Sequence, residues 1–158
     1  MIKNETLNIF TYDYPLIGND SHFIKDEIIF LSNKFKKINI IPIKKGLNNH
    51  NYTQNNIDVN YGLINEIFNI QKVLFKITKV LICKFFWKEI ISLKKKNICR
   101  KIIMTIKERY LAESVYLWVK KNKHLHNDNF YSFWSNHTLL GFYFLKQKKI
   151  IKKSFSRI

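Results

Sequence analysis

Glycine, proline and cysteine are all scarce in this sequence. Its 158 residues contain only 4 Gly, 2 Pro and 2 Cys, too few glycines and prolines for a collagen-like or linker-rich chain. The two cysteines, Cys83 and Cys99, form no CxxC pair and have no histidine at metal-ligand spacing. The sequence therefore indicates neither a metal centre nor a disulfide framework, and a reduced, cytoplasmic chain without a cofactor is the simplest expectation.

Acidic residues are also few. Against 28 Lys and Arg there are 11 Asp and Glu, which gives a formal net charge of +17. An excess of this size favours polyanionic partners such as nucleic acid, an anionic membrane leaflet or phosphorylated substrates. Most of the cations are lysines, and their clusters are scattered along the chain instead of lying on one helix. Specific recognition of nucleic acid usually relies on one concentrated basic surface, so we do not expect it here.

Long uninterrupted apolar runs are missing as well. The amino terminus has no apolar segment followed by a small-residue cleavage site, so no secretory signal is expected. The longest apolar tract, residues 67–87, is interrupted by four lysines and is a poor candidate for a membrane-spanning helix. What the chain does have is 46% hydrophobic and 15% aromatic residues. That is enough to bury one core, and we expect a single domain over residues 1–158.

The opening part of the chain alternates between strand and helix patterns. A short apolar run at residues 7–11 predicts a strand, and the turn-rich segment 12–21 predicts a loop. Apolar residues then recur every three or four positions from residue 21 to residue 35, which predicts a helix. The β-branched run 37–43 predicts a second strand. Strand, helix and strand in this order are typical of a right-handed βαβ unit with parallel strands.

The rest of the chain predicts two long helices. A long amphipathic helix is expected from residue 63 to about residue 91, and its apolar positions are Leu63, Ile67, Ile70, Leu74, Ile77 and Leu81. Three lysines, Lys72, Lys76 and Lys79, fall on its other side. The remaining expected elements are a short strand at 57–59, a second long helix at 98–121, an aromatic strand at 129–134, a helix at 136–146 and a last strand at 150–157.

Together these elements predict an α/β, Rossmann-like domain. We expect a parallel sheet of four or five strands with helices on both faces. The two long amphipathic helices are inserted before the aromatic strand.

The loop at residues 12–21 is the first candidate for a binding site, because ligands of open parallel sheets bind at the carboxyl ends of the strands. Amide groups at the start of the following helix attract anions, so a phosphate or a polar sugar could dock there. The alternative is an ordinary turn with a helix cap. His22 could act as a base or bind phosphate, or it could be a surface histidine without a role. No P-loop, GxGxxG motif, nucleophile elbow or carboxylate pair is present, so the residues alone show no catalysis.

Three segments, taken in order, resemble a known family. Tyr14-Pro15, then Gly18, then Phe-Ile-Lys-Asp-Glu-Ile at 23–28 resembles the start of bacterial glycosyltransferases of the GT-B fold, which build capsular and lipopolysaccharide sugars. The run Asp-Asn-Phe-Tyr-Ser-Phe-Trp at 128–134 resembles the aromatic strand of that family, Ile-Tyr-Ser-Tyr-Trp. The last three residues, Ser-Arg-Ile at 156–158, resemble the Ser-Arg-Ala that precedes a His-Gly dipeptide in these enzymes.

The resemblance implies the amino-terminal, acceptor-binding half of an enzyme that transfers a sugar from a nucleotide-sugar donor in surface polysaccharide synthesis. The residues that it implies for contacts with the acceptor are Gly18, Asn19, Asp20, Ser21, His22, Ser132, Trp134 and Arg157. The family often has Gly-Glu-Thr where this chain has Asp-Ser-His at 20–22. Phe133 and Trp134 have an equally good alternative role as core residues.

The resemblance also implies a membrane location and a missing half. In the family, inserted helices can face a membrane or a lipid-linked acceptor, so Lys72, Lys76 and Lys79 are candidate contacts with the inner face of a membrane. The chain ends where the His-Gly motif would begin, so the carboxyl-terminal donor-binding domain is expected to be absent. We therefore expect no turnover by this chain alone. The alternative is a basic module that binds a membrane surface or a polyanion and has no enzymatic activity.

Overall fold

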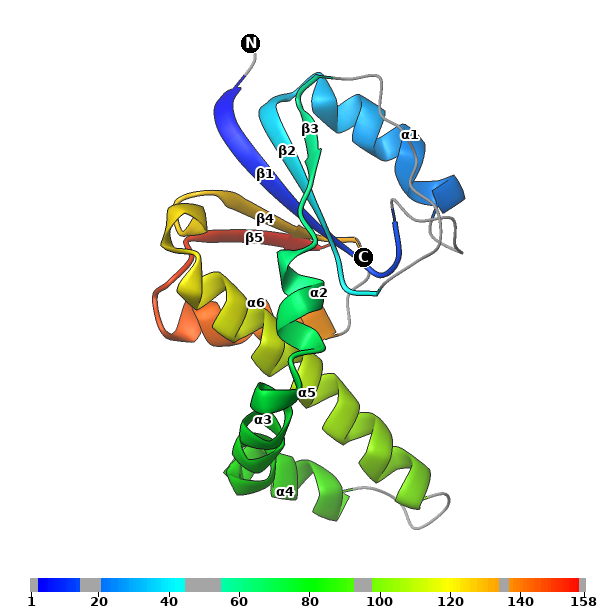
Figure 1. Cartoon of the computed structure of the whole chain (residues 1–158), viewed down its shortest axis with the longest axis vertical. Coiled ribbons are helices and arrows are strands. Elements are labelled where there is room, and N and C mark those ends of the chain that lie inside the picture. Colours follow the sequence, from blue (N-terminus) through cyan, green and yellow to red (C-terminus); the bar gives the residue numbers. More distant parts are fainter. Residues whose placement is uncertain (1–2, 15–20, 45–54, 93–97, 134–136, 157–158) are drawn as a thin grey trace.

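The computed structural model describes residues 3–14, 21–44, 55–92, 98–133 and 137–156. The strands come from the two ends of the chain, and helices follow one another in its middle part (Figure 1). In chain order the elements are β1 (Lys3–Thr11), α1 (Ser21–Ser32), β2 (Phe35–Pro42), β3 (Ile57–Val59), α2 (Gly62–Ile67), α3 (Ile70–Ile82), α4 (Lys84–Ser92), α5 (Ile98–Lys121), the 3-10 helix η1 (Lys123–Leu125), β4 (Asn129–Ser132), α6 (His137–Gln147) and β5 (Lys153–Ser156).

The five strands form one parallel sheet in the order β3-β2-β1-β4-β5. Side chains alternate between the two faces of a strand, and β1 shows how each face is covered. Leu7 and Ile9 belong to a buried cluster that includes Ile24 and Ile28 of α1. Phe10 belongs to a second cluster, formed with α2, α5 and α6 on the opposite face. The expected Rossmann-like α/β fold, with a parallel sheet between helices, is therefore confirmed.

The expected single helix from residue 63 to residue 91 is wrong. The segment forms three helices, α2, α3 and α4, with breaks at Phe68–Asn69 and at Cys83. Asn69 and Cys83 both take extended backbone angles, with ψ of 103° and 117°, which end one helix and turn the chain before the next. Breaks of only one or two residues leave the spacing of apolar residues almost intact, so the sequence pattern does not reveal them.

Helix α3 is also rotated about its axis relative to the sequence expectation. Ile70 and Leu74, which the pattern assigns to the buried side, are 84% and 75% exposed. Lys76, assigned to the polar side, is completely buried. Its ammonium group is 2.6 Å from the carbonyl oxygen of Glu66 and 3.3 Å from the Glu66 carboxylate. A buried cation needs such partners, and Glu66 at the end of α2 supplies them. The spacing of apolar residues does not indicate this contact.

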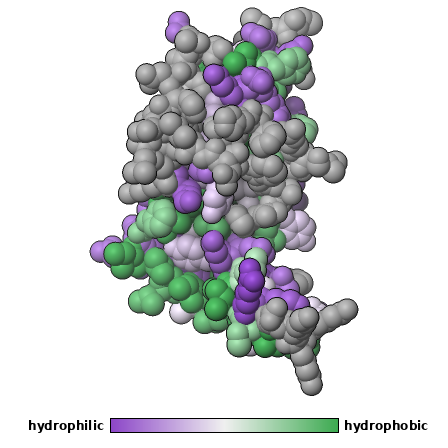
Figure 2. All heavy atoms as spheres, turned by 90° about the vertical axis from the view of Figure 1, so that its right-hand side faces the viewer, coloured by the Kyte–Doolittle hydropathy of each residue, from purple (hydrophilic) through white to green (hydrophobic). Residues whose placement is uncertain are grey.

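The helices α3 and α4 and the first half of α5 project away from the sheet (Figure 1). We call this part, residues 68–92 and 98–110, the helical arm. Two ion pairs hold its helices to α5: Lys79 with Glu113 at 2.8 Å, and Glu89 with Arg109 at 2.7 Å. Figure 2 shows hydrophobic side chains gathered on the lower part of the molecule, where the arm lies. The exposed large apolar residues of the arm are Phe68, Ile70, Leu74, Phe75, Leu81, Ile82, Trp87, Ile91, Ile98, Ile103 and Met104.

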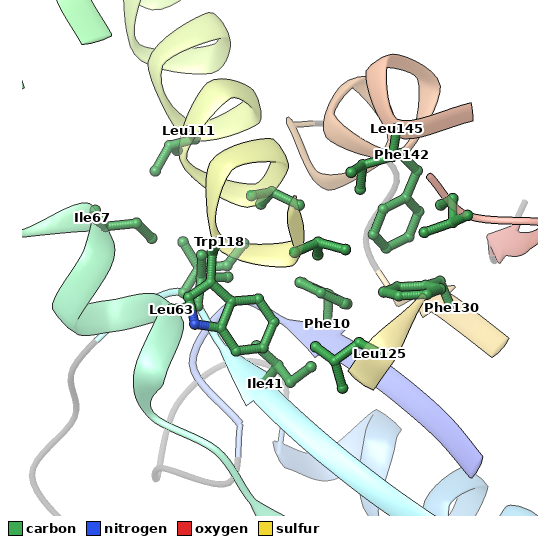
Figure 3. Close-up of a cluster of buried hydrophobic side chains, with 14 residues drawn as sticks. Phe10, Ile41, Leu63, Ile67, Leu111, Trp118, Leu125, Phe130, Phe142 and Leu145 are labelled. Atoms are coloured by element: carbon green, nitrogen blue, oxygen red, sulfur yellow. The ribbon is translucent and has the colours of Figure 1, made fainter. Parts of the chain in front are cut away.

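The larger core cluster joins the sheet to α2, α5 and α6 (Figure 3). Phe10 lies at its centre on β1. The Phe10 ring lies 5.0 Å from that of Phe142 on α6, 6.1 Å from that of Phe130 on β4 and 6.2 Å from that of Trp118 on α5. Each such aromatic pair adds about 0.5–1.5 kcal/mol to the gain from burial. This cluster fixes the positions of β1 and β4, the two strands whose ends matter most for a site.

Candidate functional site

The strand order creates one switch point in the sheet. From β1 the chain passes through α1 to β2 on one side, whereas α5 leads into β4 on the other side of β1. Ligands of such sheets bind outside the carboxyl ends of the strands at this point. Phe10 of β1 pairs with Ser132 of β4, so the chain leaves both strands at the same height. The start of the predicted loop after β1 and the carboxyl end of the predicted aromatic strand therefore lie side by side.

The described part of this edge is held by backbone hydrogen bonds. Phe133 N–H donates to the carbonyl oxygen of Phe10 at 3.1 Å, which extends the β1–β4 pairing past the end of β4. On the other side, Lys44 N–H donates to the carbonyl oxygen of Tyr12 at 2.9 Å. The Thr11 hydroxyl donates to the carbonyl oxygen of Tyr14 at 2.5 Å and closes the turn after β1. The chain is thus held at Phe10 from the side of β4 and at Tyr12 from the side of β2.

Asp13 lies in this turn and has one buried carboxylate oxygen. Its Oδ1 atom is buried and, across the described residues, has no hydrogen-bond partner. Leaving a buried polar atom unpaired costs free energy, about 1–3 kcal/mol and more for a charged group. Such an atom needs an explanation, and a bound ligand that donates a hydrogen bond to it is one. Sequence analysis did not select Asp13, although its position directly after the first strand was the available signal.

The predicted acceptor residues are only partly within view. Gly18, Asn19, Asp20, Trp134 and Arg157 lie outside the described residues. Ser21 and His22 are the first two residues of α1, which starts beyond the loop that follows β1. For these seven residues a role in acceptor binding stays a prediction.

Ser132 is the one predicted acceptor residue whose surroundings are described. It is fully buried, and its hydroxyl shares a short hydrogen bond with that of Thr138 on α6. This contact ties the end of β4 to α6. In this structure Ser132 therefore supports the edge, and its predicted contact with an acceptor is untested.

Glu27 and Tyr131 join α1 to β4. The Tyr131 hydroxyl donates to Glu27 Oε1 at 2.6 Å, and both residues are partly buried. Since α1 follows the loop of β1, this bond holds that helix against the second strand of the switch point. Glu27 thus has a structural partner.

The three lysines proposed for a membrane surface differ in their exposure. Lys72 and Lys79 reach partners at 2.7 and 2.8 Å, Glu66 and Glu113, and about two fifths of each side chain stays exposed. Lys76 is enclosed, and burial lowers its pKa below the ordinary 10.5 although Glu66 opposes this shift. A buried ammonium group cannot reach a lipid headgroup, so Lys76 is removed from that proposed surface.

Comparison with known proteins gives no relative: no family model, curated protein or solved structure matches the chain. Among the described residues no three His, Cys, Asp or Glu side chains are grouped closely enough to hold a metal ion. Nor does any described helix have the length and apolar character needed to cross a membrane. The candidate function therefore has to be argued from the carboxyl edge of the sheet and from the helical arm.

Proposed function

We propose that this chain is the acceptor-side domain of an enzyme that transfers a sugar from a nucleotide-sugar donor, as its resemblance to bacterial GT-B glycosyltransferases implies. The observation that carries the proposal is the switch point between β1 and β4. One of the segments that carry the resemblance begins at Tyr14, just after β1, and another begins at Asp128 and includes β4. The two segments are far apart in sequence, but β1 and β4 are neighbours in the sheet.

The turn after β1 supplies the chemistry that an acceptor needs. A sugar hydroxyl is a hydrogen-bond donor, and Asp13 Oδ1 is a buried acceptor that lacks one among the described residues. A carboxylate that accepts from a hydroxyl forms a short, charge-assisted bond. We therefore assign Asp13 to acceptor binding, together with the predicted loop residues that follow it.

Substitution of Asp13 by alanine separates a binding role from a structural one. We expect Asp13→Ala to leave the free energy of unfolding unchanged or to raise it, because it removes an unpaired buried acceptor. We expect the same variant to weaken the binding of methyl glycosides of glucose, galactose or N-acetylglucosamine by roughly tenfold, as for loss of one charge-assisted hydrogen bond. Isothermal titration and urea unfolding measure the two effects.

Asp26→Ala is the matched control, because Asp26 is an exposed aspartate on α1. It should change neither binding nor stability. A loss of stability in Asp13→Ala, with glycoside binding unchanged, would show that Asp13 is a structural residue and would remove the observation that supports its assignment.

A second candidate function is attachment to an anionic membrane surface through the helical arm. The arm exposes large apolar side chains, among them Ile70 at 84%, Ile82 at 82% and Ile91 at 81%. The same segment, residues 68–92 and 98–110, contains nine Lys and Arg against two Glu. Apolar side chains set among cations are typical of helices that lie in the headgroup region of anionic bilayers.

The energies favour this reading of the arm. Full burial of one Leu or Ile side chain contributes about 1.5–3 kcal/mol, and each lysine near an anionic leaflet adds about 1 kcal/mol. Insertion of only two or three of these side chains is therefore enough for measurable binding. An arm of this kind would bring the carboxyl edge of the sheet toward an acceptor carried by lipid, so the two candidate functions are compatible.

Co-sedimentation with vesicles tests the arm. We expect the chain to bind phosphatidylglycerol–phosphatidylcholine vesicles, and the combined substitutions Ile70→Ser, Leu74→Ser and Ile82→Ser to weaken binding at least tenfold. The control is Phe30→Ser, which removes an apolar side chain that is 60% exposed on α1, outside the arm. Absence of vesicle binding at low salt, or equal binding by the triple variant, would contradict the membrane function.

A further inference from the structure

A cleft lies on one face of the sheet, apart from the turn after β1 and the end of β4. It has a volume of about 590 Å³, within the usual range for small-molecule sites. Its walls come from β2 and β3, from the residues after β3, and from the segment between η1 and β4. The side chains important for its chemistry are Lys37, Asn39, Asp58, Tyr61, His124 and Asp128.

The cleft exists because one face of the sheet is apolar in the carboxyl half of β1 and β2 and polar two residues earlier. Phe10 and Ile41, at the carboxyl half, pack against the helices of the larger core. Two residues earlier on the same face, β1 has Asn8 and β2 has Asn39, and these two residues are paired in the sheet. In Figure 1 the amino halves of β1 and β2 stand clear of α2 and α5, which lie lower in the view.

A chain of partly buried hydrogen bonds builds the floor of the cleft. Asn39 Nδ2 donates to Asn8 Oδ1 at 2.8 Å, and Asn8 Nδ2 donates to Asp128 Oδ2 at 3.0 Å. Asn8 is completely buried on the central strand. Because Asn8 uses its amide on both sides, it orients the amide of Asn39 and the carboxylate of Asp128 toward each other across β1. The polar groups of the floor are thus held in place before any ligand arrives.

The charge of the cleft argues against an anionic ligand. The chain has a net charge of +17 and only 11 acidic residues, yet two of them, Asp58 and Asp128, line this cleft. Lys37 is paired with Asp58 at 2.8 Å, which neutralises both at the rim. Burial raises the pKa of Asp128 above its ordinary 3.8, against the hydrogen bond from Asn8 and the charges of His124 and Lys37. A phosphate would meet carboxylates here, whereas a hydroxyl group would meet good acceptors.

We propose that this cleft binds a neutral sugar ring, whose hydroxyl groups hydrogen-bond to the amide of Asn39 and the carboxylates of Asp58 and Asp128. Carboxylate oxygens accept from hydroxyls and the amide both donates and accepts, which suits adjacent hydroxyl groups on one ring. Tyr61 and His124 also line the cleft. The site is independent of the proposed transfer function, because none of the residues that line it belongs to the turn after β1 in which Asp13 lies.

The sugar ring could belong to a free carbohydrate or to a nucleoside, and saturation-transfer NMR distinguishes the two. The probes are methyl glucoside, methyl galactoside, adenosine and glucose 6-phosphate, each added to the full chain. We expect saturation transfer to the ring protons of the glycosides, and weaker binding of glucose 6-phosphate than of methyl glucoside. Preference for the phosphate would overturn the proposal, and so would binding of adenosine alone, since recognition would then depend on the base.

Two substitutions locate the binding in this cleft. Asp128→Asn keeps an oxygen that can accept from Asn8 but removes the charge, and we expect roughly tenfold weaker glycoside binding. Asp58→Asn acts at a side chain that is 62% exposed, so folding is not at risk, and it should weaken binding in the same direction. The control Asp26→Asn makes the same change on exposed α1 and should have no effect. Glycoside binding that is lost in Asp13→Ala and unchanged in both cleft variants would refute this site and leave the acceptor site standing.

Discussion

Removal of Glu66 should destabilise the protein far more than removal of its partner Lys76. Lys76 is completely buried and Glu66 is 8% exposed. Besides Glu66, the Lys76 ammonium group has the ring of Tyr110, 5.4 Å from Nζ to the ring centroid. Glu66→Ala leaves this cation buried with only a carbonyl oxygen and an aromatic face. Breaking a buried pair in this way costs about 3–5 kcal/mol.

The reverse substitution behaves differently. Lys76→Met fills similar space with apolar atoms, and Glu66 keeps Lys72, whose ammonium group is 2.7 Å from Oε2. Replacement of a buried charge by an apolar residue of similar size is often neutral or stabilising. We therefore expect Lys76→Met to change the free energy of unfolding by less than about 1 kcal/mol. The double variant should recover most of the stability lost in Glu66→Ala.

Urea unfolding of the four proteins, wild type, the two single variants and the double variant, measures these differences. With a slope of about 1–3 kcal/mol per M urea, a loss of 3 kcal/mol lowers the midpoint by roughly 1–3 M. The reasoning is refuted if Lys76→Met costs more than Glu66→Ala, or if the double variant is no more stable than Glu66→Ala. Either result would mean that Lys76 is not a buried cation that depends on Glu66.

Three further predictions concern single contacts and pH. A Cβ atom at Gly141 would lie 2.9 Å from Val115 Cβ. Gly141→Ala should therefore push α6 away from α5 and lower the free energy of unfolding, measured in urea, by about 1–3 kcal/mol, despite the better helix propensity of alanine. Equal stability would contradict this packing. Tyr131→Phe removes the bond to Glu27 and should cost about 1–3 kcal/mol, and no loss would show that the bond is not formed. Burial raises the pKa of Asp128 above 3.8, so ionised Asp128 lowers the stability of the wild type above that pH. Asp128→Asn should therefore gain stability relative to wild type as the pH rises from acid to neutral. A difference in the free energy of unfolding that stays constant with pH would contradict the raised pKa.

The sheet could be predicted from sequence because its signals are local. Buried parallel strands are short apolar runs, such as residues 38–41, and parallel order follows from alternation with helices. The short strand β3 and the long helix α5 have the bounds that the sequence predicts. The order of the strands then places the carboxyl ends of β1 and β4 together.

The helical arm could not be predicted from the same kind of signal. Apolar spacing shows that a helix has two different sides, but not which side a neighbouring element covers. Lys76 is buried because Glu66 lies at the end of another helix, ten residues earlier, and no local pattern encodes that contact. Ile70 and Leu74, which the pattern assigns to the buried side of α3, are consequently exposed, whereas Val80 is buried beside Lys76.

The polar residues of the sheet gave a signal that sequence analysis did not use. Asn8 and Asn39 each interrupt an apolar strand, and a buried asparagine in such a position needs partners. Their mutual bond and the bond to Asp128 became apparent only from the register of three strands. Asp13 was missed for a similar reason, because an aspartate in a turn is normally satisfied by its own loop.

The most direct test of the account is a residue-by-residue map of where an acceptor sugar binds. Amide nitrogen-15 NMR spectra of the chain, recorded during titration with methyl glycosides, report each backbone N–H separately. If the loops after β1 and β4 form one acceptor site, the amides of Thr11, Asp13 and Phe133 should shift together, with a common dissociation constant. Glycoside binding that leaves these three amides unchanged would contradict the proposed acceptor site, whatever happens in the cleft lined by Asn39, Asp58 and Asp128.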